Sequence, residues 1–305
     1  MVADLKLAVT GATGFVGGHL LGRALEAGHR VKALTRRPQP LRDGIDWIDG
    51  ALDRPDSLGR LVAGADAVIH VAGVLNARDA AGFEAGNVTG TAAMLAAAEM
   101  AGVGRFVHVS SLAAREPQLS MYGASKARSE TLVEASPVSF AIVRPPAVYG
   151  AGDRETLELF RMAARGLVLL PPKGRLSVIH ADDLARLLLA LADPGCANRL
   201  LIEPDDGHDG GWSHEEFGQA LGRAVGRRVM TLSMPQSILM LGARIDGLWR
   251  RDKAKLTPDR AAYFCHPDWT VEPSRGAPDT LWKPRIETET GLADTARWYR
   301  EAGWL

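Results

Sequence analysis

The sequence predicts an α/β protein with a doubly wound parallel sheet and a smaller, mainly C-terminal second domain. Apolar runs of strand length alternate with longer helical patterns through the first two thirds of the chain, and a glycine-rich turn follows the first run. The runs are continuously apolar, which is typical of strands covered on both faces. Repeated alternation of such strands with helices predicts a parallel sheet between two layers of helices.

The elements follow in a regular order up to Gly150 and less regularly after it. The predicted strands of the first part are Leu5–Thr10, Val31–Thr35, Asp66–Gly73, Arg105–Ser111 and Ser139–Pro145, and its predicted helices are Phe15–Ala27, Ala80–Ala101 and Tyr122–Ala135. One more strand and helix are predicted within Leu176–Ala192, a last strand within Arg199–Pro204, and later helices at His214–Val225, Gln236–Leu248 and Thr288–Ala302. We expect one domain of residues 1–150 and 176–204, and a smaller domain of residues 151–175 and 205–305.

Composition narrows the class of partner. Lys plus Arg and Asp plus Glu are 36 each, so no global field attracts nucleic acid or an anionic membrane, and we expect a small-molecule partner. The two cysteines, Cys196 and Cys265, form no CxxC pair, which favours free thiols, a reducing compartment and no bound metal. The N-terminus lacks a secretory pattern, and charges and a proline interrupt the apolar stretch 230–248. We expect a soluble, cytoplasmic protein.

The turn after the first strand carries three glycines, Gly11, Gly14 and Gly17, and opens the first helix. Glycine lets the backbone approach a pyrophosphate, and a helix N-terminus offers free N–H groups to it. The spacing is GxxGxxG rather than GxGxxG, and an ordinary tight turn is the alternative. We expect a dinucleotide here, and the predicted contacts are Gly11, Thr13, Gly14, Phe15, Val16 and Gly17.

The residues after the second strand bear on the choice of dinucleotide. A carboxylate at this position would bond the ribose hydroxyls of NAD, whereas arginine accommodates the 2′-phosphate of NADP. The chain has Arg36 and Arg37 here and no carboxylate. We predict NADP, with NAD as the alternative; two arginines that only solvate a loop are the other interpretation.

Further cofactor contacts are expected where the next strands end. Asp53 could reach the adenine edge, and Leu52 beside it is a further predicted cofactor contact. Ala72 and Gly73 could let the backbone pass beneath the cofactor ribose. Asn87 would start a helix turn on the same cleft, where it could fix a backbone kink, hold a water or cap the helix. His70, within a buried strand, is expected to be a hydrogen-bonded core residue.

Tyr122 and Lys126 stand four residues apart, and Ser110 and Ser111 end a strand upstream. On a helix, side chains at i and i+4 share one face. A unit charge about 6 Å away at an effective dielectric of about 20 contributes roughly 3 kcal/mol, or about two pKa units, which would bring a phenol toward neutral pH. The pattern predicts a tyrosine acid/base; a solvated helix face is the alternative.

Six motifs occur along the chain, which are, in order, TGATGFVG, HVAG, NVTGT, VSS, YGASK and RPPAVYG. By these motifs, residues 5 to about 192 resemble the extended short-chain dehydrogenase/reductase family. That family includes nucleotide-sugar epimerases and dehydratases, dihydroflavonol reductases and 3β-hydroxysteroid dehydrogenases. The resemblance implies a Rossmann fold and a homodimer that pairs through helices such as 80–101 and 122–135. One departure is Ala51, where the family commonly has Asp in a GDL motif, so the adenine contact would shift to Asp53 or to backbone.

The resemblance also assigns roles to residues. It makes Tyr122 the general acid/base, and Lys126 the group that lowers its pKa and bonds the nicotinamide ribose. By this resemblance a serine of the VSS run polarises the substrate carbonyl. Ser111 is favoured for this role over the neighbouring Ser110. By the same resemblance Arg36 clasps the 2′-phosphate. The remaining contacts that it implies with the nicotinamide pocket are Pro145 and Val148.

The predicted activity is hydride transfer between nicotinamide and a carbonyl or hydroxyl of a small organic substrate. A nucleotide-sugar epimerase or dehydratase with tightly bound cofactor is one alternative, and a non-catalytic NAD(P)-binding scaffold is another. In segment 151–175, cations suited to a diphosphate, Arg154, Lys173 and Arg175, occur among apolar residues. This mixture favours a smaller or more hydrophobic carbonyl compound.

Overall fold

The computed structural model describes residues 4–250 and 257–305 and divides into two compact units. The first unit is Met1–Arg144, Asp182–Glu203 and Ala277–Trp282, and the second is Pro145–Ala181, Pro204–Gly276 and Lys283–Leu305. The division differs from the predicted boundaries chiefly in three places. Residues 145–150 and 176–181 belong to the second unit, where two short strands pair with each other, and residues 277–282 belong to the first. The predicted ranges also include residues 1–3 and 251–256, which lie outside the described residues.

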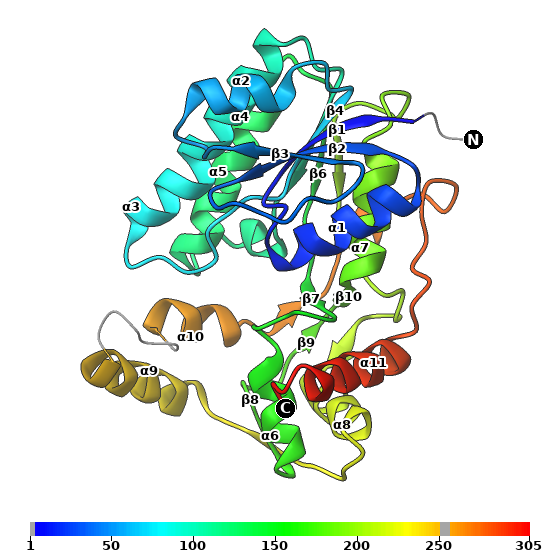
Figure 1. The fold of residues 1–305 in the computed structure, drawn as a ribbon. Coiled ribbons are helices and arrows are strands. Elements are labelled where there is room, and N and C mark those ends of the chain that lie inside the picture. The colour runs from blue at the N-terminus through cyan, green and yellow to red at the C-terminus, as the bar shows by residue number, and fades with distance from the viewer. Residues whose placement is uncertain (1–3, 251–256) are drawn as a thin grey trace. The chain divides into compact units, whose positions relative to one another are not determined.

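The first unit contains a seven-stranded sheet in the order β11-β6-β5-β4-β1-β2-β3, and all of its pairs are parallel (Figure 1). Its strands are β1 (Lys6–Thr10), β2 (Arg30–Thr35), β3 (Ile45–Asp49), β4 (Ala67–His70), β5 (Arg105–Val109), β6 (Phe140–Val143) and β11 (Leu200–Ile202). Every residue of β4, β5 and β6 is buried, as their continuous hydrophobicity predicts. The strand order reverses at β1, between β2 and β4, and ligands of such sheets bind at this reversal.

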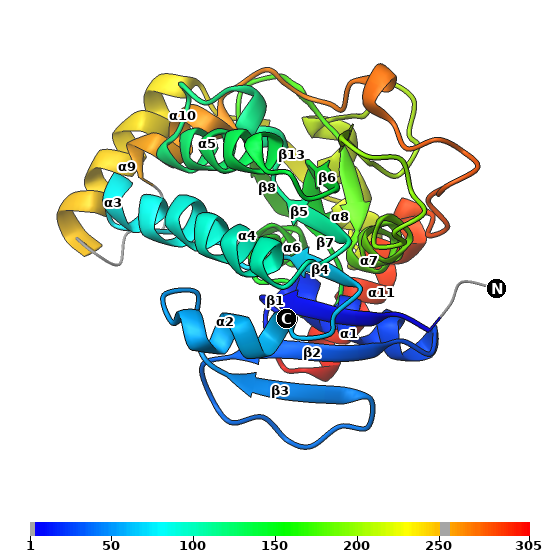
Figure 2. The same ribbon diagram turned by 90° about the horizontal axis from the view of Figure 1, so that it is seen from above.

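Helices cover both faces of this sheet, so the doubly wound architecture is confirmed. They are α1 (Phe15–Glu26), α2 (Pro55–Val62), α3 (Ala80–Phe83), α4 (Gly90–Met100), α5 (Met121–Ala135) and α7 (Ala181–Leu191). Figure 2 shows α2, α4 and α5 on one face and α1 and α7 on the other. Leu58 and Leu61 of α2 and Met94 of α4 pack against Phe106 of β5 in one buried apolar cluster. This core holds the carboxyl ends of the strands in place.

The predicted helix Ala80–Ala101 is interrupted. It comprises α3, a π-helical segment at Glu84–Thr89 and α4. A π-helical turn inserts one extra residue into the helix and often marks a functional position. The apolar periodicity on either side continues through this segment, so the pattern alone predicts one uninterrupted helix.

The second unit has short strands and five helices within the described residues. Its strands are β7 (Ala147–Tyr149), β8 (Leu167–Leu170), β9 (Arg175–Leu176), β10 (Val178–His180), β12 (Trp212–Ser213), β13 (Met230–Ser233) and β14 (Asp268–Trp269). Its helices are α6 (Leu157–Ala164), α8 (His214–Ala224), α9 (Gln236–Arg250), α10 (Pro258–Phe264) and α11 (Thr288–Glu301). β7 pairs with β10, β8 with β13, and β9 with both β12 and β14.

A separate core stabilises the second unit. Phe160 of α6 and Tyr299 of α11 are fully buried and meet edge to face, with ring centroids 5.1 Å apart. Leu221 of α8 and Leu292 of α11 belong to the same cluster. The sequence did not predict α6, β8 or the two-residue strands, because elements this short carry too few residues to establish a period. Among the described residues, no helix combines the length and the apolarity needed to cross a membrane.

Candidate active site

The glycine turn between β1 and α1 is packed so closely that side chains are excluded. Gly11 has φ +71°, and a Cβ there would lie 2.6 Å from the backbone nitrogen of Ala72. A Cβ on Gly17 would lie 2.1 Å from the carbonyl oxygen of Gly11. Contacts below 3.0 Å require the backbone itself to move. The turn after β1 therefore touches the turn after β4 at the reversal of strand order, where the sequence predicts the cofactor.

The N-terminus of α1 is open to a ligand. Gly14 is its N-cap residue and provides no side-chain cap. The N–H of Gly14 donates to the oxygen of Gly11 at 3.0 Å within the turn. Because the N-cap residue is a glycine, no side chain caps the first N–H groups of the helix, at Phe15, Val16 and Gly17. The neighbouring Thr13 is exposed. Free N–H groups at the positive end of a helix dipole suit a pyrophosphate, so this turn fits the predicted dinucleotide.

Beyond β2 the chain presents two exposed arginines. Arg36 and Arg37 directly follow Thr35, whose hydroxyl donates to the carbonyl oxygen of Arg37 at 2.6 Å and so shapes this turn. Within residues 4–250 and 257–305, neither guanidinium has an ion-pair partner. Both charges are therefore available to an anionic group.

The turn after β3 also excludes a side chain. A Cβ on Gly50 would lie 2.1 Å from the Cβ of Ser57, whose hydroxyl donates to the carbonyl oxygen of Ala51 at 3.2 Å. Leu52 is half-buried near Gly90 at the start of α4, and Asp53 is exposed. The adenine contact of Asp53 and the cofactor contact of Leu52 remain predictions.

His70 is a core residue, as predicted, although it ends β4 rather than lying in its middle. It is fully buried, and its ring nitrogens are hydrogen bonded to Thr10 at 2.8 Å and to Thr91 at 3.2 Å. Burial, reinforced by the charge of Lys126, lowers the pKa of His70 to about 3. The hydroxyl of Thr10 also accepts a hydrogen bond from the N–H of Ala72 at 3.2 Å, which ties the ends of β1 and β4 together.

Asn87 lies inside the π-helical segment, so it neither starts a helix nor caps one. Its side chain is 1% exposed, accepts a hydrogen bond from the N–H of Val74 at 2.6 Å and donates to the oxygen of Val74 at 3.0 Å. It also donates to the hydroxyl of Ser125 at 2.8 Å. Asn87 thus joins the loop after β4 to α5. It lies where the helix is interrupted, and a backbone kink was one of the roles predicted for it.

The two serines after β5 have different partners. Ser110 is buried and donates to Glu130 Oε1 at 2.5 Å, and its N–H donates to the oxygen of Val143. Ser111 is half-buried and is the N-cap of the 3₁₀ helix Leu112–Arg115, where its hydroxyl oxygen accepts from the N–H of Ala113 at 3.2 Å. The Ser110 proton is committed to a buried carboxylate, whereas the Ser111 hydroxyl retains a proton to donate.

Tyr122 and Lys126 share a face of α5 one helical turn apart. Lys126 is 3% exposed, and its Nζ donates to the backbone oxygen of Val109 at 2.7 Å. Burial lowers the pKa of Lys126 to about 8, against an opposing effect of Glu130. The Tyr122 ring is half-buried, with its centroid 6.2 Å from that of Phe83.

Several predicted residues converge on this lysine. A Cβ built on Gly73 would lie 3.2 Å from Asn87 Oδ1 and 3.9 Å from Lys126 Nζ. The loop after β4, the π-helical segment and α5 therefore meet at one point within the first unit. An ammonium group, a phenol on the same helix and a serine at the end of the adjoining strand can together move a proton to or from a bound oxygen.

Pro145 and Val148 belong to the second unit. Pro145 is buried, and Val148 is a half-buried residue of β7 opposite Ile179 of β10. Their contribution to a nicotinamide pocket stays a prediction.

Comparison with known proteins identifies the family. A sequence model of the NAD dependent epimerase/dehydratase family matches residues 7–198. The chain belongs to this family. Members are NAD(P)-dependent enzymes of the extended short-chain dehydrogenase/reductase type, so the predicted family and enzyme class are confirmed.

Two curated relatives of this family resemble the whole chain. One is the ceramide reductase of Caulobacter vibrioides (strain NA1000 / CB15N), 40% identical over 322 residues that cover 100% of this chain and 98% of the relative. Another is the 2-alkyl-3-oxoalkanoate reductase of Stenotrophomonas maltophilia (strain K279a), 30% identical over 332 residues that cover 94% of this chain and 97% of the relative. These relatives support oxidoreductase activity.

A solved structure, MoeE5 in complex with UDP-glucose and NAD, has the same fold. It superimposes with a TM-score of 0.76 over 97% of this chain and 99% of MoeE5, at 24% sequence identity.

Sequence reasoning missed residues that link the predicted ones. Ser125 bonds Asn87, Thr10 bonds the turn after β4, and Glu130 bonds Ser110. Glu130 stands four residues after Lys126 and eight after Tyr122 on the same helix. The helical period could therefore have placed Glu130 near the predicted site, whereas no sequence spacing links Thr10 to Ala72.

Proposed function

We propose that this enzyme is an NADP-dependent reductase of a lipophilic carbonyl compound, with Tyr122 as the general acid/base. The observation that carries the proposal is the buried ammonium of Lys126, held against the oxygen of Val109 two residues before Ser111 and one turn from Tyr122. A buried cation stabilises a neighbouring phenolate, because the surroundings screen its charge less than water does. No other pair on α5 joins a phenol to a buried cation within the described residues.

The residues would divide the chemistry in the following way. When bound, the nicotinamide supplies or accepts the hydride. The Ser111 hydroxyl donates a hydrogen bond to the substrate oxygen, where negative charge develops during reduction. The Tyr122 phenol gives its proton to that oxygen, and Lys126 stabilises the phenolate that remains.

The preference for NADP is supported by charge. Arg36 and Arg37 occupy the first two positions after β2, where a carboxylate would favour NAD, and both are exposed. A 2′-phosphate would gain charge-assisted hydrogen bonds there, whereas the ribose hydroxyls of NAD would lack the carboxylate that they usually bond.

The proposed substrate is a carbonyl group of a ceramide-type lipid. Support comes from the two relatives that match the chain over nearly its full length, whose names refer to a ceramide and to an alkyl-substituted oxoalkanoate. The second unit also exposes large apolar side chains on one side of α9, where Ile238, Leu241 and Ile245 are 48%, 58% and 54% exposed at positions i, i+3 and i+7. An apolar face of this kind favours a hydrocarbon ligand over a sugar nucleotide.

The test is a reductase assay with NADPH on a series of 3-oxo lipids of increasing chain length, beside nucleotide sugars. We expect turnover of the lipids, with kcat/KM rising with chain length, and stoichiometric oxidation of NADPH. Turnover of a nucleotide sugar by protein that retains its cofactor through purification, with no added NADPH, would instead support an epimerase.

Substitutions on α9 test the proposed lipid substrate separately from the proposed chemistry. Ile238→Ser with Leu241→Ser should weaken the equilibrium binding of long-chain lipids and leave the binding of short-chain lipids unchanged. The control is Met100→Ser, which removes an apolar side chain that is 90% exposed on α4 in the first unit. An equal effect of the two variants would contradict a role for α9.

A further inference from the structure

Helix α5 holds the end of β5 with two side chains of opposite charge. Lys126 donates to the backbone oxygen of Val109 at 2.7 Å, and Glu130 accepts the hydroxyl proton of Ser110 at 2.5 Å. Val109 and Ser110 are consecutive and immediately precede Ser111. The helix that carries the proposed acid/base thus also fixes the strand end that carries the proposed carbonyl-polarising serine.

The carboxylate of Glu130 is itself held by a bidentate ion pair. Arg144 donates from Nε to Oε1 at 2.9 Å and from Nη2 to Oε2 at 2.6 Å. The side chains of Glu130 and Arg144 are 5% and 11% exposed. A planar pair shielded from water keeps both groups in one orientation, because two parallel hydrogen bonds fix the angle as well as the distance.

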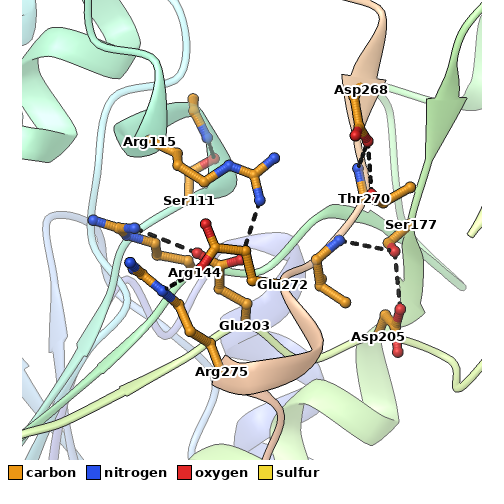
Figure 3. A network of polar contacts seen from close by, with 12 residues as sticks. Ser111, Arg115, Arg144, Ser177, Glu203, Asp205, Asp268, Thr270, Glu272 and Arg275 are labelled. Atoms are coloured by element: carbon orange, nitrogen blue, oxygen red, sulfur yellow. Dashed lines mark hydrogen bonds and ion pairs between the residues drawn. The ribbon is translucent and has the colours of Figure 1, made fainter. Parts of the chain in front are cut away.

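A second buried carboxylate connects this ion pair to Arg115, at the C-terminal end of the segment 110–115 that contains Ser110 and Ser111. Glu203, whose side chain is 0% exposed, accepts from Arg144 Nη1 at 3.3 Å and from Arg115 Nη1 at 3.3 Å (Figure 3). Arg115 is the last residue of the 3₁₀ helix that Ser111 caps. The ion pairs therefore reach both ends of the segment 110–115, with Ser111 between them.

We propose that Glu130 is a positioning residue that sets the orientation of Ser111 and keeps Lys126 in its ammonium form. The proposal rests on the proposed function, because it takes Ser111, Tyr122 and Lys126 as the reacting set. Glu130 itself does not touch the substrate: it acts through Ser110 on one side and through Lys126 on the other.

The charges around Lys126 explain the electrostatic half of this role. His70 on β4 and His108 on β5 face the lysine, and burial holds the pKa of each below its ordinary value, so both are neutral at pH 7. Arg144, at the end of β6, pairs with Glu130. Burial lowers the pKa of Lys126, and the carboxylate of Glu130 opposes this effect. Removal of that carboxylate should lower the pKa of Lys126 further, so the ammonium form would be lost at a lower pH.

Glu130→Gln is the decisive variant, and Glu134→Gln, an exposed glutamate one turn later on the same helix, is its matched control. We expect Glu130→Gln to lower kcat on the order of 10²-fold, since small displacements of a catalytic group have effects of this size. Its pH–rate profile should lose activity at a lower pH on the alkaline side. NADPH binding, followed by nicotinamide fluorescence, should change less than about twofold, and Glu134→Gln should match wild type throughout. An unshifted profile would overturn the electrostatic half of the proposal.

The titration of Lys126 can be measured without turnover. NMR of protein labelled with ¹³C at lysine Cε, with Lys126→Arg to assign the signal, should show the Lys126 transition at a lower pH in Glu130→Gln than in wild type. Identical transitions in wild type, Glu130→Gln and Glu134→Gln would overturn the inference even if the enzyme is a reductase. Conversely, if Tyr122→Phe retains full activity, the proposed function fails while this titration still reports on Glu130.

Two milder variants keep the proposal testable if Glu130→Gln does not fold. Glu130→Asp retains the charge but shortens the reach to Ser110, and Ser110→Ala removes that hydrogen bond while both charges stay. We expect each to lower kcat by roughly tenfold with the titration of Lys126 little changed. Wild-type kcat in both variants would overturn the positioning of Ser111 by Glu130.

Discussion

Lys126 donates a hydrogen bond from Nζ to the backbone oxygen of Val109 at 2.7 Å, two residues before Ser111. The contact ties α5 to the carboxyl end of β5, and it buries an ammonium group that is only 3% exposed. Tyr122 lies one turn earlier on the same helix, so this bond, together with the contact of Glu130 with Ser110, holds the helix that carries Tyr122 against the strand end before Ser111.

Loss of the Tyr122 hydroxyl should greatly reduce turnover and leave cofactor binding nearly unchanged. We expect Tyr122→Phe to reduce kcat by roughly 10²- to 10⁴-fold, because general acid/base groups contribute this much. The matched control is Tyr263→Phe, which removes a phenol hydroxyl from α10. Steady-state kinetics with NADPH and fluorescence titration of the cofactor separate the two effects; turnover close to wild type would remove Tyr122 from the mechanism.

Activity should fall on the alkaline side near the pKa of Lys126. Burial lowers that pKa from its ordinary value of 10.5 to about 8, so the ammonium form that would stabilise a phenolate is present below about pH 8 and is lost as the pH rises through it. A plot of kcat/KM against pH should bend downward there. A plateau that persists to about pH 10, the ordinary range of a lysine, would show that the charge of Lys126 is not required.

The arginines after β2 should discriminate between the two dinucleotides. We expect Arg36→Ala to weaken NADPH binding by about ten- to a hundredfold, since a charge-assisted hydrogen bond contributes about 1.5–3 kcal/mol. NADH binding should stay within a factor of about two because it lacks the 2′-phosphate. Arg30→Ala, at the opposite end of β2, is the control. Tighter binding of NADH than of NADPH by wild type would refute the predicted preference.

Two adjacent glycines of α1 should respond in opposite ways to alanine. A Cβ on Gly17 would lie 2.1 Å from the oxygen of Gly11, whereas one on Gly18 would meet nothing within 4 Å. Gly17→Ala should therefore destabilise the fold by about 1–3 kcal/mol and weaken cofactor binding. Gly18→Ala should stabilise it by up to about 1 kcal/mol through helix propensity. Thermal unfolding measures the stability of the two variants, and titration measures their affinity for the cofactor. Equal effects of Gly17→Ala and Gly18→Ala would contradict the close packing of the glycine turn.

Acid should destabilise the first unit through its buried histidines. Burial lowers the pKa of His70 from 6.5 to about 3 and holds that of His108 well below its ordinary value. The unfolded chain therefore binds protons that the native state does not, and the free energy of unfolding falls as the pH drops below about 6.5. His29 is also buried in this unit, and burial lowers its pKa as well. His108→Leu should reduce the slope in denaturant titrations at several pH values, because it removes one of these three groups. An unchanged slope would contradict the assignment.

Local patterns were sufficient to predict the strands of the sheet other than β3, for which no range was predicted, and the glycine turn after β1. Strands buried on both faces are continuously apolar, glycines at tight turns are irreplaceable, and a helix brings residues four apart onto one face. For this reason β1, α1 and the pairing of Tyr122 with Lys126 could be placed without a structure. Strand ends were overextended by one to three residues; after β4, for example, the apolar run continues through Val71 and Ala72 into the following turn.

Contacts between residues distant in sequence could not be predicted in this way. Hydrogen bonds join Asn87 to Ser125 and to the loop after β4, and ion pairs join Glu130 to Arg144 and on to Glu203. Such contacts depend on where the sheet brings separate strand ends together, and no periodicity records that position.

The amino-acid sequence by itself determined the doubly wound architecture, the family and the helix face that presents a phenol beside an ammonium group, because each depends on spacing within one segment. The tertiary structure alone decided that Ser110 is committed to a buried carboxylate, that Asn87 lies in a π-helical turn, and that β7 and β10 pair with each other in the second unit. These features arise from the packing of segments tens of residues apart, and only the folded chain brings such segments within hydrogen-bonding distance.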